Sequence, residues 1–124
     1  MRQTLSLLSD AVDALRVIEE ETIGIGFDEF VAERRRRTSV YWHLAVLGES
    51  SNGLLRLNPE LEPMFPELAR AIALRHRIVH GYFAIDDRTI WGVVTEQLPG
   101  LADRLDEVRL TLDASRHATG PEDA

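Results

Sequence analysis

Residues 74–86, with the sequence LRHRIVHGYFAID, bring together side chains that can bind a phosphate or transfer a proton. Arg75, His76 and His80 fall within six positions, and Tyr82 follows two residues after His80. An arginine offers a planar, permanently charged fork that suits a phosphate, and an imidazole exchanges protons near neutral pH. These residue types therefore fit chemistry on a phosphate. The alternative is a helix end, in which His80 complements the helix dipole and Tyr82 packs.

Apolar residues recur at spacings of three and four over most of the chain, which predicts helices. The first helix spans residues 3–22 and ends at the glycines of GIGF. The second runs from about residue 30 to 57, with Asp28 as its cap. The small residues on both sides of Glu49 would let a neighbouring helix come close to the second helix.

The third helix carries the reactive cluster. Pro66 fits its first turn, after the proline-rich bend NPELEPMFP, because proline has no N–H to leave unpaired there. Gly81 is suited to the left-handed conformation that would end the helix after His80. Asp86 then caps a fourth helix, with a staple of two isoleucines around it.

The fourth helix is predicted as one long amphipathic helix that begins after Asp86, with apolar positions from Trp91 to Leu112, and that Pro99 kinks but does not end. Residues 115–124 lack apolar periodicity and are expected to form a flexible tail. The prediction is thus an all-α protein, a four- to five-helix up-and-down bundle that forms a single domain over residues 1–114.

The length, cysteine content and charge of the chain exclude several classes of protein. A chain of 124 residues without cysteine is expected to form one domain, with neither a disulfide framework nor a thiolate for catalysis. Acidic residues early in the chain and the lack of a long apolar run predict a cytoplasmic protein with no membrane partner. The net charge of −7 is unlike that of a nonspecific nucleic-acid binder, so any contact with nucleic acid must be local.

Arg75 falls in line with the apolar residues Leu68, Ile72 and Val79 of its own helix. A guanidinium on an apolar stripe needs an acceptor, because an unpaired buried charge is costly. Glu49 of the second helix is the carboxylate that we expect to supply it. Two interpretations remain open at this point: a structural ion pair, or an anion clamp for a phosphate.

His80 lies five residues after Arg75, which is about 140° around an ideal helix, in five steps of roughly 100°. The two side chains would therefore not share a face. A loosened last turn at Gly81, or apposition across a dimer, would bring both to one phosphate. Beyond Gly81 an extended chain would project His80 and Tyr82 to the same side.

His76 and His80 also have the i, i+4 spacing with which a helix presents two imidazoles to zinc. Arg77 stands where the metalloprotease pattern has glutamate, and a metal there would meet the positive charge of its neighbours. The sequence therefore predicts neither a metal site nor a cofactor.

All fourteen basic residues are arginine, and four of them form the run Arg34 to Arg37. We interpret this run as a solvated helix face, in which Glu33 and Arg37 pair at i, i+4. The alternative is a docking surface for RNA or for an acidic partner.

The stretch RHRIVHGY resembles the Arg-x4-His-x-Tyr motif of the HepT-like toxins, a branch of the HEPN superfamily of small helical nucleotide-binding and ribonuclease domains. GFDEF, LGES and VHGYFAIDDRTIWGVVTEQLPGL resemble the corresponding stretches of that family, so the likeness covers most of residues 1–112. His76 is a departure, since family members commonly have asparagine there. It would either keep a polar role or mark a copy with altered activity.

The resemblance implies the toxin of a type VII-like toxin–antitoxin module. Such toxins are metal-independent endoribonucleases, and they form dimers in which two motifs meet at a shared cleft. Arg75 and His80 would be the catalytic pair, with His76 and Glu49 in supporting roles. Tyr82 would be the residue that the antitoxin, a minimal nucleotidyltransferase, modifies with AMP taken from ATP.

In this interpretation the substrate is RNA, cut by attack of its own 2′-hydroxyl, and Arg70 and Arg77 add weaker contacts to it; no DNA is expected. The partners are the antitoxin and a second copy of the chain, in a homodimer or a larger hetero-oligomer. The alternative function is a non-catalytic helical module that binds nucleotide or docks a nucleotidyltransferase, with Arg75 in a structural role.

Overall fold

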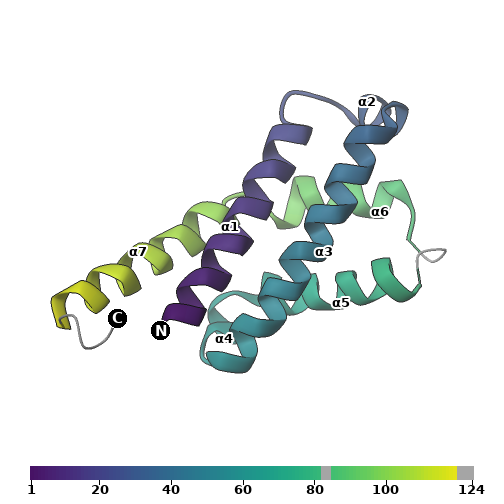
Figure 1. The fold of residues 1–124 in the computed structure, drawn as a ribbon. Helices are drawn as coiled ribbons and strands as arrows, with labels where there is room; N and C mark the ends of the chain where they lie inside the picture. Colours follow the sequence, from purple (N-terminus) through teal and green to yellow (C-terminus); the bar gives the residue numbers. More distant parts are fainter. Residues whose placement is uncertain (82–84, 120–124) are drawn as a thin grey trace.

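The structure is a computed structural model, and it describes residues 1–81 and 85–119. Over these residues every regular element is a helix, which confirms the predicted all-α class (Figure 1). No helix in this part of the chain is both long and apolar enough to cross a membrane. In chain order, the elements are α1 (Arg2–Thr22), α2 (Phe27–Ala32), α3 (Arg34–Leu57), α4 (Leu61–Met64), α5 (Pro66–His80), α6 (Asp87–Gly92), the π-helical turn η2 (Val93–Gln97) and α7 (Leu101–Thr119).

The central helix of the bundle is α3. It runs antiparallel beside α1 and packs against α5 on another side (Figure 1). Helix α7 packs against α1. The apolar stripes meet in the core that these helices enclose. Among its members, no more than 2% exposed, are Leu8, Leu15, Leu44, Leu54 and Leu105. The spacing of apolar residues thus predicted which faces of α1 and α3 are buried.

The predicted second helix is two helices, because Glu33 is extended (φ −109°, ψ 106°) between α2 and α3. Asp28 does not cap a helix but lies in the first turn of α2. In an unbroken helix Arg37, seven residues after Phe30, would share the face of Phe30. The break lets Phe30 be fully buried, with its ring centroid 5.2 Å from that of Trp91.

The ends of α5 and α6 are mostly as predicted. Pro66 occupies the first turn of α5, after a bend that also contains the short α4. Helix α5 ends at His80, but Gly81 is not left-handed (φ −135°, ψ 40°), so that prediction is wrong. The Gly81 N–H donates to the Arg77 carbonyl oxygen at 2.9 Å. Asp86 caps α6 by accepting a hydrogen bond of 2.7 Å from the backbone N–H of Thr89.

Pro99 ends the helix that we predicted it would only kink. The chain passes from α6 into the π-helical turn, where the Leu98 N–H bonds the Val93 carbonyl oxygen at 3.1 Å. Pro99 has no N–H to continue the ladder, and Gly100 has φ +82°, a left-handed conformation that favours glycine. Helix α7 then starts afresh at Leu101.

The last helix is longer than predicted. We expected the folded part to end at residue 114, but α7 continues to Thr119. A helix can continue beyond its apolar stripe because its backbone hydrogen bonds do not depend on core contacts. Gly120 and Pro121, which follow in the sequence, are poor helix formers.

Candidate functional site

Helix α5 rests directly on α3 at Gly48, and this contact positions Arg75. A Cβ atom on residue 48 would lie 2.3 Å from the Arg75 Cβ and 2.6 Å from the Ala71 carbonyl oxygen, so a side chain there would have to push the helices apart. At the same crossing Arg75 Nε lies 3.1 Å from Glu49 Oε2. The predicted close approach and the predicted Arg75–Glu49 pair are both confirmed.

Arg75 lies at the border of the buried face of α5 and not within it. That face runs through Leu68 and Leu74, whereas Val79 is 43% exposed. The predicted stripe through Arg75 and Val79 is therefore wrong: the residues before them, Leu74 and Ile78, lie closer to the core. A shift of one residue rotates the buried face by about 100° around the helix. The Arg75 side chain is 36% exposed and that of Glu49 66% exposed, so a phosphate can reach the guanidinium.

The two histidines of the motif lie on the outward face of α5. The His76 and His80 rings have centroids 4.9 Å apart, and both residues are exposed. Among the described residues, no hydrogen bond or ring contact joins His80 to Arg75, as expected from their angular separation. The same part of the chain shows no group of three or more His, Cys, Asp or Glu residues that could hold a metal. Tyr82, and with it the predicted His80–Tyr82 pair, lies outside the described residues.

Arg70 and Arg77, the predicted weaker RNA contacts, lie on another side of α5. Both line a pocket of about 300 Å³ that α5 forms with α6 and η2, above Leu44 and Leu47 of α3. The structure thus separates these two arginines from Arg75.

The pairing predicted for Arg37 is wrong. Its Nη1 lies 3.4 Å from Asp87 Oδ2, at the start of α6. Glu33 pairs instead with Arg35 and Arg36, at 3.5 and 3.3 Å. Because Glu33 is extended, its side chain does not follow the helical direction that an i, i+4 pair requires.

Asp87 joins α6 to α3 through a second contact. The Tyr41 hydroxyl donates a hydrogen bond of 2.9 Å to Asp87 Oδ1. Burial, followed by this hydrogen bond to a carboxylate, raises the pKa of the Tyr41 phenol well above its ordinary value. Tyr41 and Arg37 therefore hold the first turn of α6 against α3.

A surface pocket of about 570 Å³ lies where α3, the last turn of α5 and the start of α6 meet. We did not predict this pocket from the sequence. The available signal was Trp42, which is two residues from Val40 and so lies off the buried stripe of α3. The pocket is lined by Arg34, Arg37, Thr38, Tyr41, Trp42, Ala45, Ile78, Val79 and Asp87.

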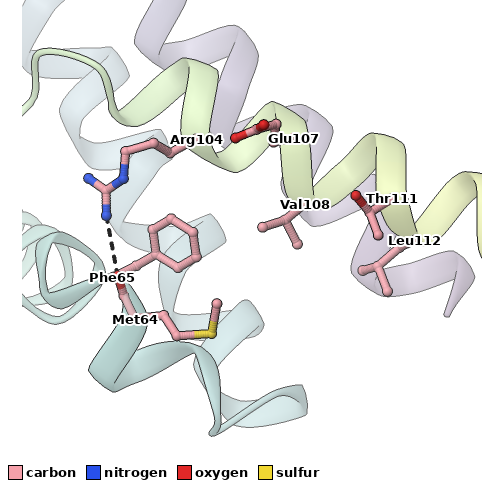
Figure 2. A pocket seen from close by; sticks show the side chains of 7 residues that line it. All are labelled: Met64, Phe65, Arg104, Glu107, Val108, Thr111 and Leu112. Atoms are coloured by element: carbon pink, nitrogen blue, oxygen red, sulfur yellow. Dashed lines mark hydrogen bonds between the residues drawn. The ribbon is translucent and has the colours of Figure 1, made fainter.

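Another pocket, of about 510 Å³, lies between α4 and α7, and none of the predicted site residues that the structure describes lines it (Figure 2). Arg104 crosses one of its walls. The guanidinium donates to the Met64 carbonyl oxygen at 3.2 Å and to Glu67 Oε2 at 2.7 Å, and it lies 4.9 Å from the centroid of the Phe65 ring. These contacts fasten α7 to the beginning of α5, so we assign Arg104 a structural role.

Comparison with known proteins agrees with the motif. A profile of the family described as "Ribonuclease HepT-like" matches residues 11–108. The chain is 33% identical over 106 residues to the "Probable ribonuclease HepT" of Thermococcus cleftensis, covering 82% of this chain and 92% of that protein. It is 27% identical over 109 residues to the "Putative RNase MJ1380" of Methanocaldococcus jannaschii, covering 86% and 97% of the two chains. No solved structure was found to match. From the extent of these matches, the chain belongs to the HepT-like ribonuclease family.

Proposed function

We propose that the protein is the toxin of a toxin–antitoxin pair and cleaves RNA without a metal ion, with Arg75 and His80 as its catalytic pair. The observation that carries this proposal is the setting of Arg75. Backbone contact at Gly48 holds its Cβ, Glu49 contacts its Nε, and about a third of its side chain is exposed. A guanidinium held in this way can offer its terminal nitrogens to a phosphate.

The reaction needs a proton carrier and a group that stabilises negative charge. The 2′-oxygen of RNA attacks the adjacent phosphorus, loses its proton to a base, and displaces the 5′-oxygen of the next nucleotide. His80 accepts the proton or returns one to the leaving 5′-oxygen, and Arg75 stabilises the charged phosphorane. The products are a 2′,3′-cyclic phosphate and a 5′-hydroxyl end.

Cleavage is tested with purified protein, RNA and EDTA. The wild type should cut the RNA, whereas His80→Ala and Arg75→Ala should each lose at least about a hundredfold in rate. His117→Ala, a matched histidine change near the far end of α7, should cut at the wild-type rate. Failure of the wild type to cut, or equal cutting by His80→Ala, would remove the catalytic proposal. The Arg75–Glu49 pair would then favour the non-catalytic module, in which Arg75 is structural.

A dimer would explain how Arg75 and His80 act together although they lie on different faces of α5. We propose that two copies meet through the outward face of α5, which carries His76 and His80. Mixing refolded Arg75→Ala and His80→Ala chains tests this arrangement. If one subunit supplies the arginine and the other the histidine, the mixture regains part of the activity that each variant lacks. A mixture that stays inactive, although mass spectrometry shows hybrid dimers, places both residues of a site in one subunit.

Control by AMP transfer is proposed for Tyr82. Its phenolic oxygen would attack the α-phosphorus of ATP bound to a minimal nucleotidyltransferase, losing its proton and releasing pyrophosphate. The bulky, charged adduct would then occupy the place of the substrate phosphate near His80. Tyr41, the only other tyrosine, is a matched control, because its hydroxyl is bound to Asp87. Co-expression with the transferase should add one AMP to the wild type and to Tyr41→Phe, and none to Tyr82→Phe.

A further inference from the structure

Trp42 is more exposed than most tryptophans, which are largely buried in folded proteins. It lies on the outer face of α3 with 66% of its surface accessible. The other tryptophan, Trp91, packs against the rings of Phe27 and Phe30, at centroid distances of 6.4 and 5.2 Å. A large aromatic ring left in water gives up favourable burial, and such rings are enriched at binding surfaces. Trp42 is therefore a candidate for contact with a ligand.

The pocket beside Trp42 combines an aromatic wall with a cationic end. Its apolar part is formed by Trp42 and by Val79, which directly precedes the motif residue His80. Arg34 and Arg37 lie at the other end. Asp87, the one carboxylate among the described residues that line the pocket, is bonded by Arg37 and by the Tyr41 hydroxyl, which offsets its charge.

Arg34 contributes the remaining positive charge. It is exposed and makes no salt bridge with any residue that the structure describes, whereas its neighbours Arg35 and Arg36 both pair with Glu33. Arg34 and Trp42 are about eight residues apart in α3, so their Cα atoms are separated by roughly 12 Å along the helix axis, at about 1.5 Å per residue. A segment of single-stranded nucleic acid can span such a distance with a base at one end and a phosphate at the other.

We propose that this pocket binds single-stranded RNA, with a nucleobase stacked on the Trp42 indole and a neighbouring phosphate on Arg34. The site rests on the proposed function, and it would hold the nucleotides that flank the phosphate at His80. Stacking on an aromatic ring beside cationic side chains is how single strands are commonly bound. A second copy of the chain fits less well. Of the described residues that line the pocket, only Trp42 and Val79 are large, apolar and exposed, and a stable interface buries about 800 Å² per partner.

The binding test uses a single-stranded RNA oligonucleotide in EDTA, with all variants made in His80→Ala so that cleavage does not interfere. Binding should quench the emission of Trp42, while Trp91→Phe leaves the quenching unchanged because Trp91 is packed among other rings. Trp42→Leu should weaken binding about five- to a hundredfold, and Trp42→Phe should restore much of it. Arg34→Ala should lower the slope of log Kd against log salt by about 0.7.

The controls separate this site from its alternatives. If labelled RNA binds without quenching Trp42, or if Trp42→Leu binds as tightly as its parent, the site is overturned. It is also overturned if Trp42→Leu turns a dimer into a monomer in sedimentation, because Trp42 would then belong to a subunit interface. Quenched, Trp42-dependent binding by a wild type that cuts no RNA would remove the catalytic proposal and leave this site standing.

Discussion

The two halves of α5 each make an ion pair with another helix, but in different surroundings. In residues 66–74, which contain all three buried residues of α5, Glu67 is only 12% exposed and lies 2.7 Å from Arg104. In residues 75–80, which contain none, Arg75 pairs at 3.1 Å with a Glu49 that is 66% exposed. The first pair anchors α5 to α7. The second stabilises little, and because it involves only Nε of Arg75, the terminal nitrogens of that guanidinium can still reach a phosphate.

The largest expected difference between the halves is in packing. Leu68 is fully buried, so Leu68→Ala should lower the free energy of unfolding by about 2–5 kcal/mol. Val79 is 43% exposed in the second half, and Val79→Ala should change it by about 0.5 kcal/mol or less. Urea denaturation of both variants measures the contrast. Equal losses would mean that the two halves are held alike.

The boundary between the halves is tested at Gly48. Gly48→Ala places a methyl group against Ala71 and Arg75 and should destabilise the protein by about 1–3 kcal/mol while slowing RNA cleavage. Gly53→Ala is the matched control in the same helix. Its Cβ would meet only the flexible end of the Leu7 side chain, at 2.9 Å. The change should therefore leave the free energy of unfolding unaltered or raise it by up to about 1 kcal/mol, because alanine favours a helix more than glycine does. Similar losses in stability for the two variants would show that the crossing at Gly48 is not tight.

The two ion pairs should also differ when their carboxylates are neutralised. Glu67→Gln removes a charge from a mostly buried site and should cost roughly 1 kcal/mol or more. Glu49→Gln removes one from an exposed site and should cost less than about 0.5 kcal/mol. Thermal unfolding at low salt is sensitive enough to compare them. A larger loss for Glu49→Gln would reverse the assignment of anchor and exposed pair.

The smallest effect concerns the cap that follows the exposed half of α5. The hydrogen bond from the Thr89 backbone N–H lowers the pKa of the Asp86 carboxyl below its ordinary value of 3.8. Its stabilising contribution is therefore complete above about pH 4 and is lost as the pH falls through the lowered folded-state pKa. Asp86→Asn keeps a side-chain acceptor that does not titrate. The free energy of unfolding of the wild type, compared with that of Asp86→Asn by urea denaturation, should fall between about pH 6 and about pH 3, because one carboxylate becomes protonated. A difference between the two proteins that does not change with pH would contradict this cause.

Features that depend on neighbouring residues in the chain were predictable. Pro66 at the start of α5 and Asp86 as the cap of α6 follow from local backbone chemistry, and the structure has both. The Arg75–Glu49 pair was also predicted, from the place of Glu49 among small residues that let α5 approach, although Arg75 is less buried than its spacing indicated. The motif that resembles the HepT-like toxins led to the family that the comparisons establish.

Features that depend on distant parts of the chain were not predictable. Arg37 pairs with Asp87, fifty residues further along, and nothing close to either residue in the sequence indicates this contact. The break at Pro99 is different, because its cause is local: Pro99 has no N–H and Gly100 has a positive φ. We missed it because the apolar spacing continues across both residues. The exposure of Trp42 depends on which helices cover α3, which is settled only when the bundle forms.

Where two helices meet backbone to backbone, as at Gly48, their separation does not depend on the side chains that fill the core around them. Apolar residues elsewhere in the bundle can then be exchanged for others of similar volume with little displacement of the Arg75 Cβ. Most of the core can thus drift in sequence while the guanidinium keeps its height above α3. Sequence change elsewhere in the core is therefore tolerated as long as residue 48 remains glycine.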